Sequence, residues 1–289
     1  MTHALVISSF VASSSVGGEV ARLIFARFGF ETSLLPTVMF GRHPGHGKPG
    51  GGPVSADDFQ SVLSGIEANL GDKAPDIIVT GYFASPDQLE MIADYLRRIK
   101  RRIGGAKRPK VIVDPVIGDF GKGLFVAPAI AQSLIATLLP LADWICPNLF
   151  ELQHIAGREL VKDGDFLALR DQLQAGLLVS SIPPSQAEPA NDIGLLLTQE
   201  GNVRRLYHPF VPENLPNGLG DATTAFFAAG LAAGLDPVAA FDMCFRRIEG
   251  LVDYVEAQRA QTRFAAPGEH ARSGGAELPL AAYLFGEHR

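Results

Sequence analysis

The chain has 289 residues, of which 47% are hydrophobic and 19% are charged, and its formal net charge is −6. This composition is typical of a globular protein with a large apolar core, and it excludes an intrinsically disordered chain. The acidic balance argues against a general nucleic-acid-binding protein, because such a protein needs a basic face for the phosphates. A local basic pocket for a single nucleotide is still compatible with it.

The sequence carries no sign of a membrane span, a secretion signal or a cysteine-based site. No apolar run reaches the roughly 18 residues that a membrane helix needs. Residues 1–7 lack the basic start and the long apolar segment of a signal peptide. The two cysteines, Cys146 and Cys244, do not have the paired spacing of a zinc site or a disulfide framework. We therefore expect a reduced, cytoplasmic protein with no membrane partner.

In the first half of the chain, short apolar runs alternate with longer segments of helical period. The predicted strands cover residues 4–8, 33–40, 76–82 and 110–114, and the predicted helices cover 16–28, 57–70, 85–103 and 127–139. The continuous apolar run 76–82 is typical of a strand that is buried on both faces of a parallel sheet. The helix 85–103 has a clear start, with Ser85 as its cap, Pro86 at its first position and Gln88 completing a capping box.

The second half of the chain continues this alternation. Strands are predicted at 144–146, 177–181, 194–198 and 204–210, and helices at 149–156, 165–174, 220–233 and 237–258. The last two strands form an antiparallel pair, and a polar stretch at 272–277 precedes a short apolar tail. Strands that alternate with helices predict a three-layer α/β/α fold with a mostly parallel central sheet. Because there is no repeat and no linker, we expect one domain over residues 1–289, with ligands beyond the carboxyl ends of the strands.

Residues 42–53 form a predicted loop that is rich in glycine and proline. Within it, residues 45–50 match the pattern GxGxxG of dinucleotide-binding proteins, but that pattern needs a helix that opens directly after it. Gly51, Gly52 and Pro53 cannot begin such a helix, so we reject a dinucleotide site here. The GxxxxGK[ST] motif of P-loop enzymes is also absent from the sequence. The loop is either an ordinary mobile surface loop or a flap that covers a site.

A second glycine motif, Gly218-Leu219-Gly220-Asp221, opens a predicted helix of small apolar residues. Its glycines allow a ligand to approach the backbone, and the helix start offers free N–H groups and the positive end of the helix dipole. The motif therefore suits an anion, with the Asp221 carboxylate at its mouth to take a proton from a substrate hydroxyl. For this segment alone, the simpler interpretation is an ordinary acidic residue in the first turn of a helix.

Two further groups of polar residues follow predicted strands. Asp114 and Asp119 lie in a glycine-rich loop after a buried strand, and such oxygen ligands suit Mg²⁺ that is shared with phosphate. Lys122, in the same loop, could reach a phosphate, although an exposed loop lysine is the simpler interpretation. Asn148 and Glu151 lie at the start of a short predicted helix, where they could join a cluster of metal and phosphate. Each acid also has an ordinary interpretation, in a solvated turn or in the first turn of a helix.

Five short segments occur in an order and at spacings that match one known family. They are Val16-Gly17-Gly18 with Gly29-Phe30-Glu31, Thr80-Gly81-Tyr82, Asp114-Pro115-Val116-Ile117-Gly118-Asp119, Pro140-Leu141-Ala142-Asp143 with Pro147-Asn148-Leu149-Phe150-Glu151, and Gly218-Leu219-Gly220-Asp221. On these segments the chain resembles the pyridoxal kinases of the ribokinase-like superfamily over nearly its whole length. The resemblance implies ATP- and Mg²⁺-dependent phosphorylation of the 5′-hydroxymethyl group of a B6 vitamer by a homodimer. It leaves open whether a monovalent cation is needed.

The resemblance also implies a role for each matching residue. Asp221 would be the catalytic base, and the backbone of Gly218, Leu219 and Gly220 would form the anion hole. The other residues on the nucleotide side would be Asn148, Glu151 and either Ser180 or Ser181. The metal would lie near Asp114, Asp119 and Glu151. The substrate pocket would include Ser9, Val16, His43 and Tyr82, with residues 42–53 as its flap.

Three positions depart from the family's usual pattern. Leu219 stands where the family usually has a threonine whose hydroxyl helps to hold a phosphate. Losing one hydrogen bond to a charged group costs roughly 1.5–3 kcal/mol, or about ten- to a hundredfold. Pro44 replaces a common threonine beside the substrate ring, and Phe125 stands where some members have tyrosine. We therefore expect the kinase activity to be weakened rather than abolished, and the contacts with the substrate ring to be altered.

Two other functions stay open. Another ribokinase-like kinase, acting on hydroxymethylpyrimidine or a sugar, would share Asp221 and the anion hole but would differ at Ser9, His43 and Tyr82. A ligand-binding or regulatory protein on the same scaffold would explain the replaced threonines. Such a protein, however, would have no need of the catalytic acid.

Overall fold

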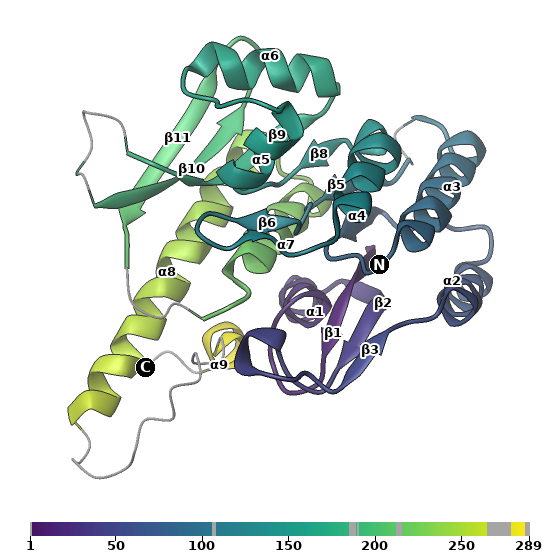
Figure 1. Ribbon diagram of the computed structural model, residues 1–289, viewed down its shortest axis with the longest axis horizontal. Helices are drawn as coiled ribbons and strands as arrows, with labels where there is room; N and C mark the ends of the chain where they lie inside the picture. Colours follow the sequence, from purple (N-terminus) through teal and green to yellow (C-terminus); the bar gives the residue numbers. More distant parts are fainter. Residues whose placement is uncertain are drawn as a thin grey trace.

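The computed structural model describes residues 2–105, 108–184, 189, 191–211, 216–264 and 279–286. Its centre is a nine-stranded sheet in the order β11-β10-β9-β8-β5-β4-β1-β2-β3 (Figure 1). The strands from β9 to β2 in this order pair in parallel, and β10, β11 and β3 add antiparallel edges. The strands are β1 His3–Val11, β2 Glu31–Phe40, β3 Gly51–Pro53, β4 Ile77–Thr80, β5 Lys110–Val113, β8 Trp144–Ile145, β9 Gly176–Ile182, β10 Asp192–Thr198 and β11 Val203–Pro209. The predicted fold class is confirmed.

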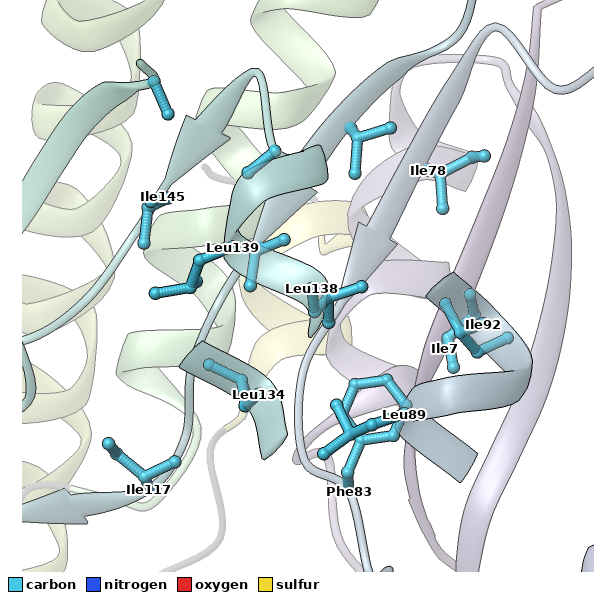
Figure 2. Close-up of a cluster of buried hydrophobic side chains, with 14 of the residues drawn as sticks. Ile7, Ile78, Phe83, Leu89, Ile92, Ile117, Leu134, Leu138, Leu139 and Ile145 are labelled. Carbon is cyan, nitrogen blue, oxygen red and sulfur yellow. The ribbon is translucent and has the colours of Figure 1, made fainter. Parts of the chain in front are cut away.

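Helices cover both faces of the sheet because the side chains of each central strand alternate between two cores. In β1, Leu5 and Ile7 point into one core, whereas Ala4 and Val6 point into the other. Figure 2 shows part of the first core, where Ile7 and Ile78 of the sheet pack with side chains of α3. This core is covered by α2 Ala56–Leu70, α3 Pro86–Arg102, α4 Pro128–Ser133, α5 Leu149–Ala156 and α6 Asp163–Leu173. The second core is covered by α1 Gly18–Arg27, α7 Leu219–Ala232, α8 Pro237–Phe264 and α9 Leu280–Phe285.

The start of α3 is capped differently from the predicted capping box. Ser85 Oγ accepts the amide of Gln88 at 3.3 Å, as expected. The Gln88 side chain, however, accepts the amide of Ala84 rather than that of Ser85, and its NH₂ group donates to the carbonyls of Thr37 and Val54. A fully buried amide must satisfy both its donor and its acceptor atoms. Gln88 therefore links α3 to the end of β2 as well as capping the helix.

The predicted helical segment 127–139 is helical in the structure, but it is not one regular α-helix. The helix α4 ends at Ser133, and a π-helical turn at Leu134–Leu138 and a 3-10 turn at Leu139–Leu141 follow it. Pro140 lacks the N–H group of a helical hydrogen bond, and its ring clashes with the preceding turn. A regular α-helix therefore cannot continue through this position.

Two short hairpins lie in segments that the sequence patterns describe only as loops. β3 pairs antiparallel with the end of β2, and Pro44–His46 form a 3-10 turn, so the segment 42–53 is not a loop throughout. β6 Gly118–Asp119 pairs with β7 Gly123–Leu124 after β5. Strands of two or three residues are too short to leave a periodic signal.

The end of the chain departs in part from the sequence-based expectations. α8 continues beyond the predicted end at residue 258, and the apolar tail contains α9. The polar stretch 272–277 lies outside the described residues. Within the described ranges, every helix is too short or too polar to cross a lipid bilayer.

Candidate active site

A cavity of about 660 Å³ lies at the carboxyl ends of the parallel strands, where ligands of such sheets bind. Its wall is built from the segments that follow these strands, together with the β6–β7 hairpin and the start of α7. The predicted site residues that line it are Ser9, Val16, His43, Tyr82, Asp114, Asp119, Asn148, Glu151, Ser180, Gly218, Gly220 and Asp221. The fold thus brings most of the predicted site into one cavity.

The start of α7 is held against the connection between β1 and α1. Asp221 Oδ2 accepts the backbone amide of Gly17 at 2.9 Å, across 204 positions of the sequence. Gly17 and Gly218 both have positive φ angles, of 59° and 100°. A Cβ atom at Gly17 would lie 2.1 Å from Ser9 Oγ, and one at Gly218 would lie 2.9 Å from the carbonyl oxygen of Ser15. Glycine is therefore required on both sides of this contact.

Asp221 combines a partly exposed position at the cavity wall with an altered acidity. Burial raises the pKa of this carboxyl to about 6, while the hydrogen bond from Gly17 opposes the rise. A carboxyl group with a pKa near 6 is mostly ionised at pH 7. Its pKa is also close enough to that pH for effective proton transfer, which suits a general base.

Asp114 lies deeper in the same wall, at the end of β5. Its carboxylate accepts the hydroxyl of Thr224 at 2.7 Å, and the residue is only 8% exposed. Burial and the carboxyls of Glu151 and Asp221 raise the pKa of Asp114 well above its ordinary value. A buried acid whose pKa is raised by neighbouring carboxyls is a favourable environment for a cation, because a positive charge stabilises its ionised form.

Glu151 and Asn148 join the start of α5 to the β6–β7 hairpin. Glu151 Oε1 accepts the amides of Ile117 and Gly118, and Oε2 accepts the amide of Asn148. Asn148 in turn accepts the amide of Glu151 and donates to the carbonyl of Gly118. Burial raises the pKa of Glu151 to about 7, although these amides favour its ionised form. The helix cap that the sequence indicates is therefore present, and it also orients the hairpin.

The acids do not form a complete metal site by themselves. Within the described parts of the chain, no three His, Cys, Asp or Glu side chains are arranged to hold a metal ion. Asp119 is partly exposed on the hairpin, where its Oδ2 lies 3.7 Å from Lys122 Nζ. Mg²⁺ in phosphate-transfer sites takes one or two carboxylates and completes its shell with phosphate oxygens and water. Asp114 and Asp119 fit that pattern, since both line the cavity.

The side of the cavity that holds the predicted substrate residues is less polar. Ser9, Val16 and Tyr82 line it together with His43 and Pro44. His43 Nδ1 accepts the amide of Gly45 and lies 3.4 Å from the Asn217 amide nitrogen. Burial, followed by the nearby His46 and Lys122, lowers the pKa of His43, so its ring is neutral near pH 7. Because Nδ1 accepts the Gly45 amide, the neutral ring carries its proton on Nε2, which can donate one hydrogen bond.

Two predicted site residues do not line the cavity. Ser180 lines it, whereas its neighbour Ser181, which has a φ angle of 59° at the register shift between β9 and β10, does not. Leu219 is the first residue of α7, and its side chain packs against the second core. Leu219 therefore lies outside the cavity lining, between Gly218 and Gly220, which belong to it.

Several lining residues were not predicted. Thr224 has no sequence signal beyond its place one turn after the glycine motif, and its contact with Asp114 joins positions 110 residues apart. Asn217 precedes the glycine motif, and Thr223 lies in the first turn of α7. Lys122 lines the cavity and its side chain is 65% exposed, so it is an exposed loop lysine as the simpler interpretation has it, and its contact with a phosphate stays a prediction.

Comparisons with known proteins agree with this architecture. The model of the phosphomethylpyrimidine kinase family matches residues 54–259. A pyridoxal kinase PdxY from Vibrio vulnificus is 32% identical over an alignment of 284 positions, which covers 93% of this chain and 96% of the relative. The crystal structure of pyridoxal kinase from Entamoeba histolytica is similar with a TM-score of 0.81 and 26% identity, over 99% of this chain and 96% of that one. The structure of the Entamoeba enzyme with PLP gives a TM-score of 0.78 over the same shares. On this evidence, the chain belongs to the pyridoxal kinase family.

Proposed function

We propose that this protein transfers the γ-phosphoryl group of ATP to the 5′-hydroxymethyl group of pyridoxal, or of pyridoxine or pyridoxamine. The observation that carries this proposal is the Asp221 carboxylate, which lies at the cavity wall beside the glycine-flanked start of α7. Phosphoryl transfer needs positioning and charge stabilisation more than covalent chemistry from the protein. The named activity of the relatives in Vibrio and Entamoeba supports the same conclusion.

The phosphates of ATP bind at the start of α7 in this proposal. The backbone amides from Gly218 to Asp221 form the anion hole, since the first amides of a helix have no partner within it. Asn148 and Ser180, which line the same cavity, are the proposed contacts on its nucleotide side. Glu151 acts there by holding the β6–β7 hairpin through its three backbone hydrogen bonds.

Asp114 and Asp119 would hold the magnesium ion, with Glu151 behind them. Bound Mg²⁺ neutralises charge on the phosphates and orients them for transfer. Lys122 adds a positive charge beside Asp119 at the mouth of the cavity. A need for a monovalent cation stays open.

The vitamer binds on the other side, with its ring between Ser9, Val16, His43 and Tyr82. Its hydroxymethyl group then faces Asp221. As the hydroxyl oxygen bonds to the γ-phosphorus and the bond to ADP breaks, Asp221 accepts the hydroxyl proton and later releases it to solvent. The segment 42–53, which contributes His43, Pro44 and Gly45 to the cavity, is the proposed flap on this side.

The pH dependence of kcat/KM follows from the pKa of Asp221. Because the base must be ionised, we expect kcat/KM to be constant above that pKa and to fall about tenfold for each pH unit below about 6. Initial rates from pH 5 to 8 check this expectation. An acid limb that is unchanged in the Asp221→Asn variant would assign the titration to another group.

Replacement of Leu219 by threonine tests the missing phosphate contact. The family pattern predicts that Leu219→Thr lowers KM for ATP or raises kcat by up to about tenfold, provided that the shorter side chain turns from the second core toward the cavity and donates its hydroxyl to a phosphate. Leu235→Thr, on an exposed leucine after α7, is the control for the change in residue type. Unchanged kinetics would mean that the phosphate is held by the backbone alone.

The direct test is formation of pyridoxal 5′-phosphate from pyridoxal and Mg-ATP, followed by absorbance. A second candidate, hydroxymethylpyrimidine phosphorylation, is motivated by the family model that matches residues 54–259 and by the altered Pro44. The same assay with hydroxymethylpyrimidine, read as ADP release, separates the two substrates. Binding of pyridoxal by calorimetry without turnover would favour a non-catalytic B6-binding protein instead.

The predicted homodimer, the single domain and the cytoplasmic location stay predictions. Light scattering of the purified protein checks the first of them. A mass near 62 kDa, about twice the 30.8 kDa of the chain, would indicate the dimer.

A further inference from the structure

A second, much smaller cavity lies behind the candidate active site. Its volume is about 20 Å³, and its polar lining residues are Ser8, Thr80, Asp114, Asp221 and Thr224. A polar cavity above about 10–15 Å³ can hold one water molecule if two to four polar groups surround it. Both the size and the lining meet this requirement.

The hydroxyl groups of Ser8 and Thr80 point to an occupant of this cavity. Ser8 lies near the end of β1 and is 4% exposed, and Thr80 ends the neighbouring strand β4 and is fully buried. Neither hydroxyl has a hydrogen-bond partner among the residues that the structure describes. Leaving a buried hydroxyl unpaired is costly, so buried polar groups usually have a protein or water partner.

The surrounding backbone preserves room for the Ser8 hydroxyl. Gly81 follows Thr80, and a Cβ atom at this position would lie 2.5 Å from Ser8 Oγ. Any larger residue at position 81 would displace this hydroxyl. The small residue therefore maintains the polar lining of the cavity.

We propose that this cavity binds one ordered water molecule that joins the carboxylates of Asp114 and Asp221. The water accepts hydrogen bonds from the hydroxyls of Ser8 and Thr80 and donates its two protons to the two carboxylates. A water molecule has two donors and two acceptors, and the lining offers two hydroxyl donors and two carboxylate acceptors. All four hydrogen bonds are thus matched in kind.

A bare monovalent cation fits this cavity less well than water. A cation would take oxygen lone pairs from all four groups, so the hydroxyl protons of Ser8 and Thr80 would have to turn elsewhere. No other acceptor for them is recorded among the described residues. Water gives each hydroxyl an acceptor and leaves no donor unpaired.

This water fixes the proposed base from behind. Asp221 is already held by the amide of Gly17, and Asp114 is held by the hydroxyl of Thr224. The water connects these two anchored carboxylates and opposes rotation of the Asp221 side chain. Ser8 and Thr80 are thereby positioning residues, and this kinetic part of the inference rests on the proposed role of Asp221.

The structural part is tested by a high-resolution crystal structure of the wild-type protein. We expect one density peak in this cavity, at about 2.5–3.0 Å from Ser8 Oγ and from Thr80 Oγ1. Crystals soaked in rubidium chloride should show no anomalous signal there. A cavity without a peak, or one with a rubidium signal, would overturn the water site.

The kinetic part is tested by Thr80→Val and Ser8→Ala, each of which removes one hydroxyl with little change of shape. We expect each variant to lower kcat about tenfold, since a misplaced base loses part of the transition-state stabilisation, while KM for pyridoxal and ATP changes less than about twofold. Thr80→Ser keeps the hydroxyl and should restore most of kcat. Melting temperatures show which variants are folded. If one of the two variants does not fold, the variant at the other position still tests the role of the water.

Thr32→Val is the matched control, because Thr32 of β2 also has a buried hydroxyl without a partner but does not line this cavity. Its kcat should equal that of the wild type. Wild-type kcat in both Thr80→Val and Ser8→Ala would overturn the positioning role, as would a loss of kcat in Thr80→Ser equal to that in Thr80→Val.

If Asp221→Asn remains active while the water peak is present, the role of Asp221 fails but the water site stands. If Asp221→Asn is inactive and the water peak is absent, the role of Asp221 stands but the water site fails.

Discussion

Asp221→Asn is expected to lower kcat by about 10²–10⁴, which is the range typical of a positioned general base. The asparagine oxygen can still accept the amide of Gly17, so the start of α7 should stay in place. The side chain can no longer take a proton from the substrate hydroxyl. KM for ATP and pyridoxal should therefore change little, while turnover falls. Initial-rate kinetics with pyridoxal and Mg-ATP measure both quantities.

Asp236→Asn provides the matched control for this substitution. Asp236 is also an aspartate at a helix start, where its carboxylate accepts the amides of Val238 and Ala239 at the beginning of α8. It does not line the active-site cavity. Its replacement should leave kcat unchanged. Wild-type turnover in Asp221→Asn, with an intact fold by circular dichroism, would contradict the assignment of the base.

Glu151→Ala is expected to produce the largest loss of stability among the predicted site residues. The Glu151 side chain is 2% exposed and accepts three backbone amides. Each buried donor left unpaired costs about 1–3 kcal/mol, although water entering the space offsets part of this cost. We expect a loss of about 3–5 kcal/mol, which corresponds to a melting temperature roughly 5–8 °C lower for a protein of this size. Differential scanning calorimetry measures the shift.

The same substitution should also weaken ATP binding. Ile117 and Gly118 begin the segment that carries Asp119 and Lys122, so loss of their anchor frees the hairpin. KM for ATP should rise more than KM for pyridoxal, which binds on the other side of the cavity. Glu159→Ala, on an exposed acid in the loop after α5, should change neither property. An unchanged melting temperature in Glu151→Ala would show that these backbone bonds are dispensable.

The parts of the fold that were predictable are those with strong local signals. The helix at 149–156 agrees with α5 residue for residue, because Pro147, Asn148 and Glu151 mark its start and Gly157 its end. The apolar runs of β4 and β5 identify buried parallel strands. The sequence-based prediction failed where tertiary contacts override the local sequence pattern. The Gln88 side chain serves Thr37 and Val54 as well as its own helix, and nothing near Gln88 in the sequence indicates this.

The candidate site also contains residues that the sequence identifies and residues that it does not. Asp221 and the glycines before it were recognisable, because a glycine-flanked helix start has a local composition that suits an anion. Ser180 could not be distinguished from Ser181 before the direction of the strand end was known. Leu219 stands inside the motif, yet its side chain packs into the core rather than toward the cavity.

The sequence by itself determined the alternation of strands and helices, the positions of the chemical groups and the family to which their order points. The first two features depend on residue types and on spacings within about 20 residues, which local physics governs. The family follows from the order of five motifs between residues 16 and 221. Only the tertiary structure decided the contacts of Asp221 with Gly17, of Thr224 with Asp114 and of Glu151 with the hairpin. These pairs lie 204, 110 and 34 positions apart. They meet because parallel strands direct all their carboxyl ends to one edge of the sheet, whatever their separation along the chain.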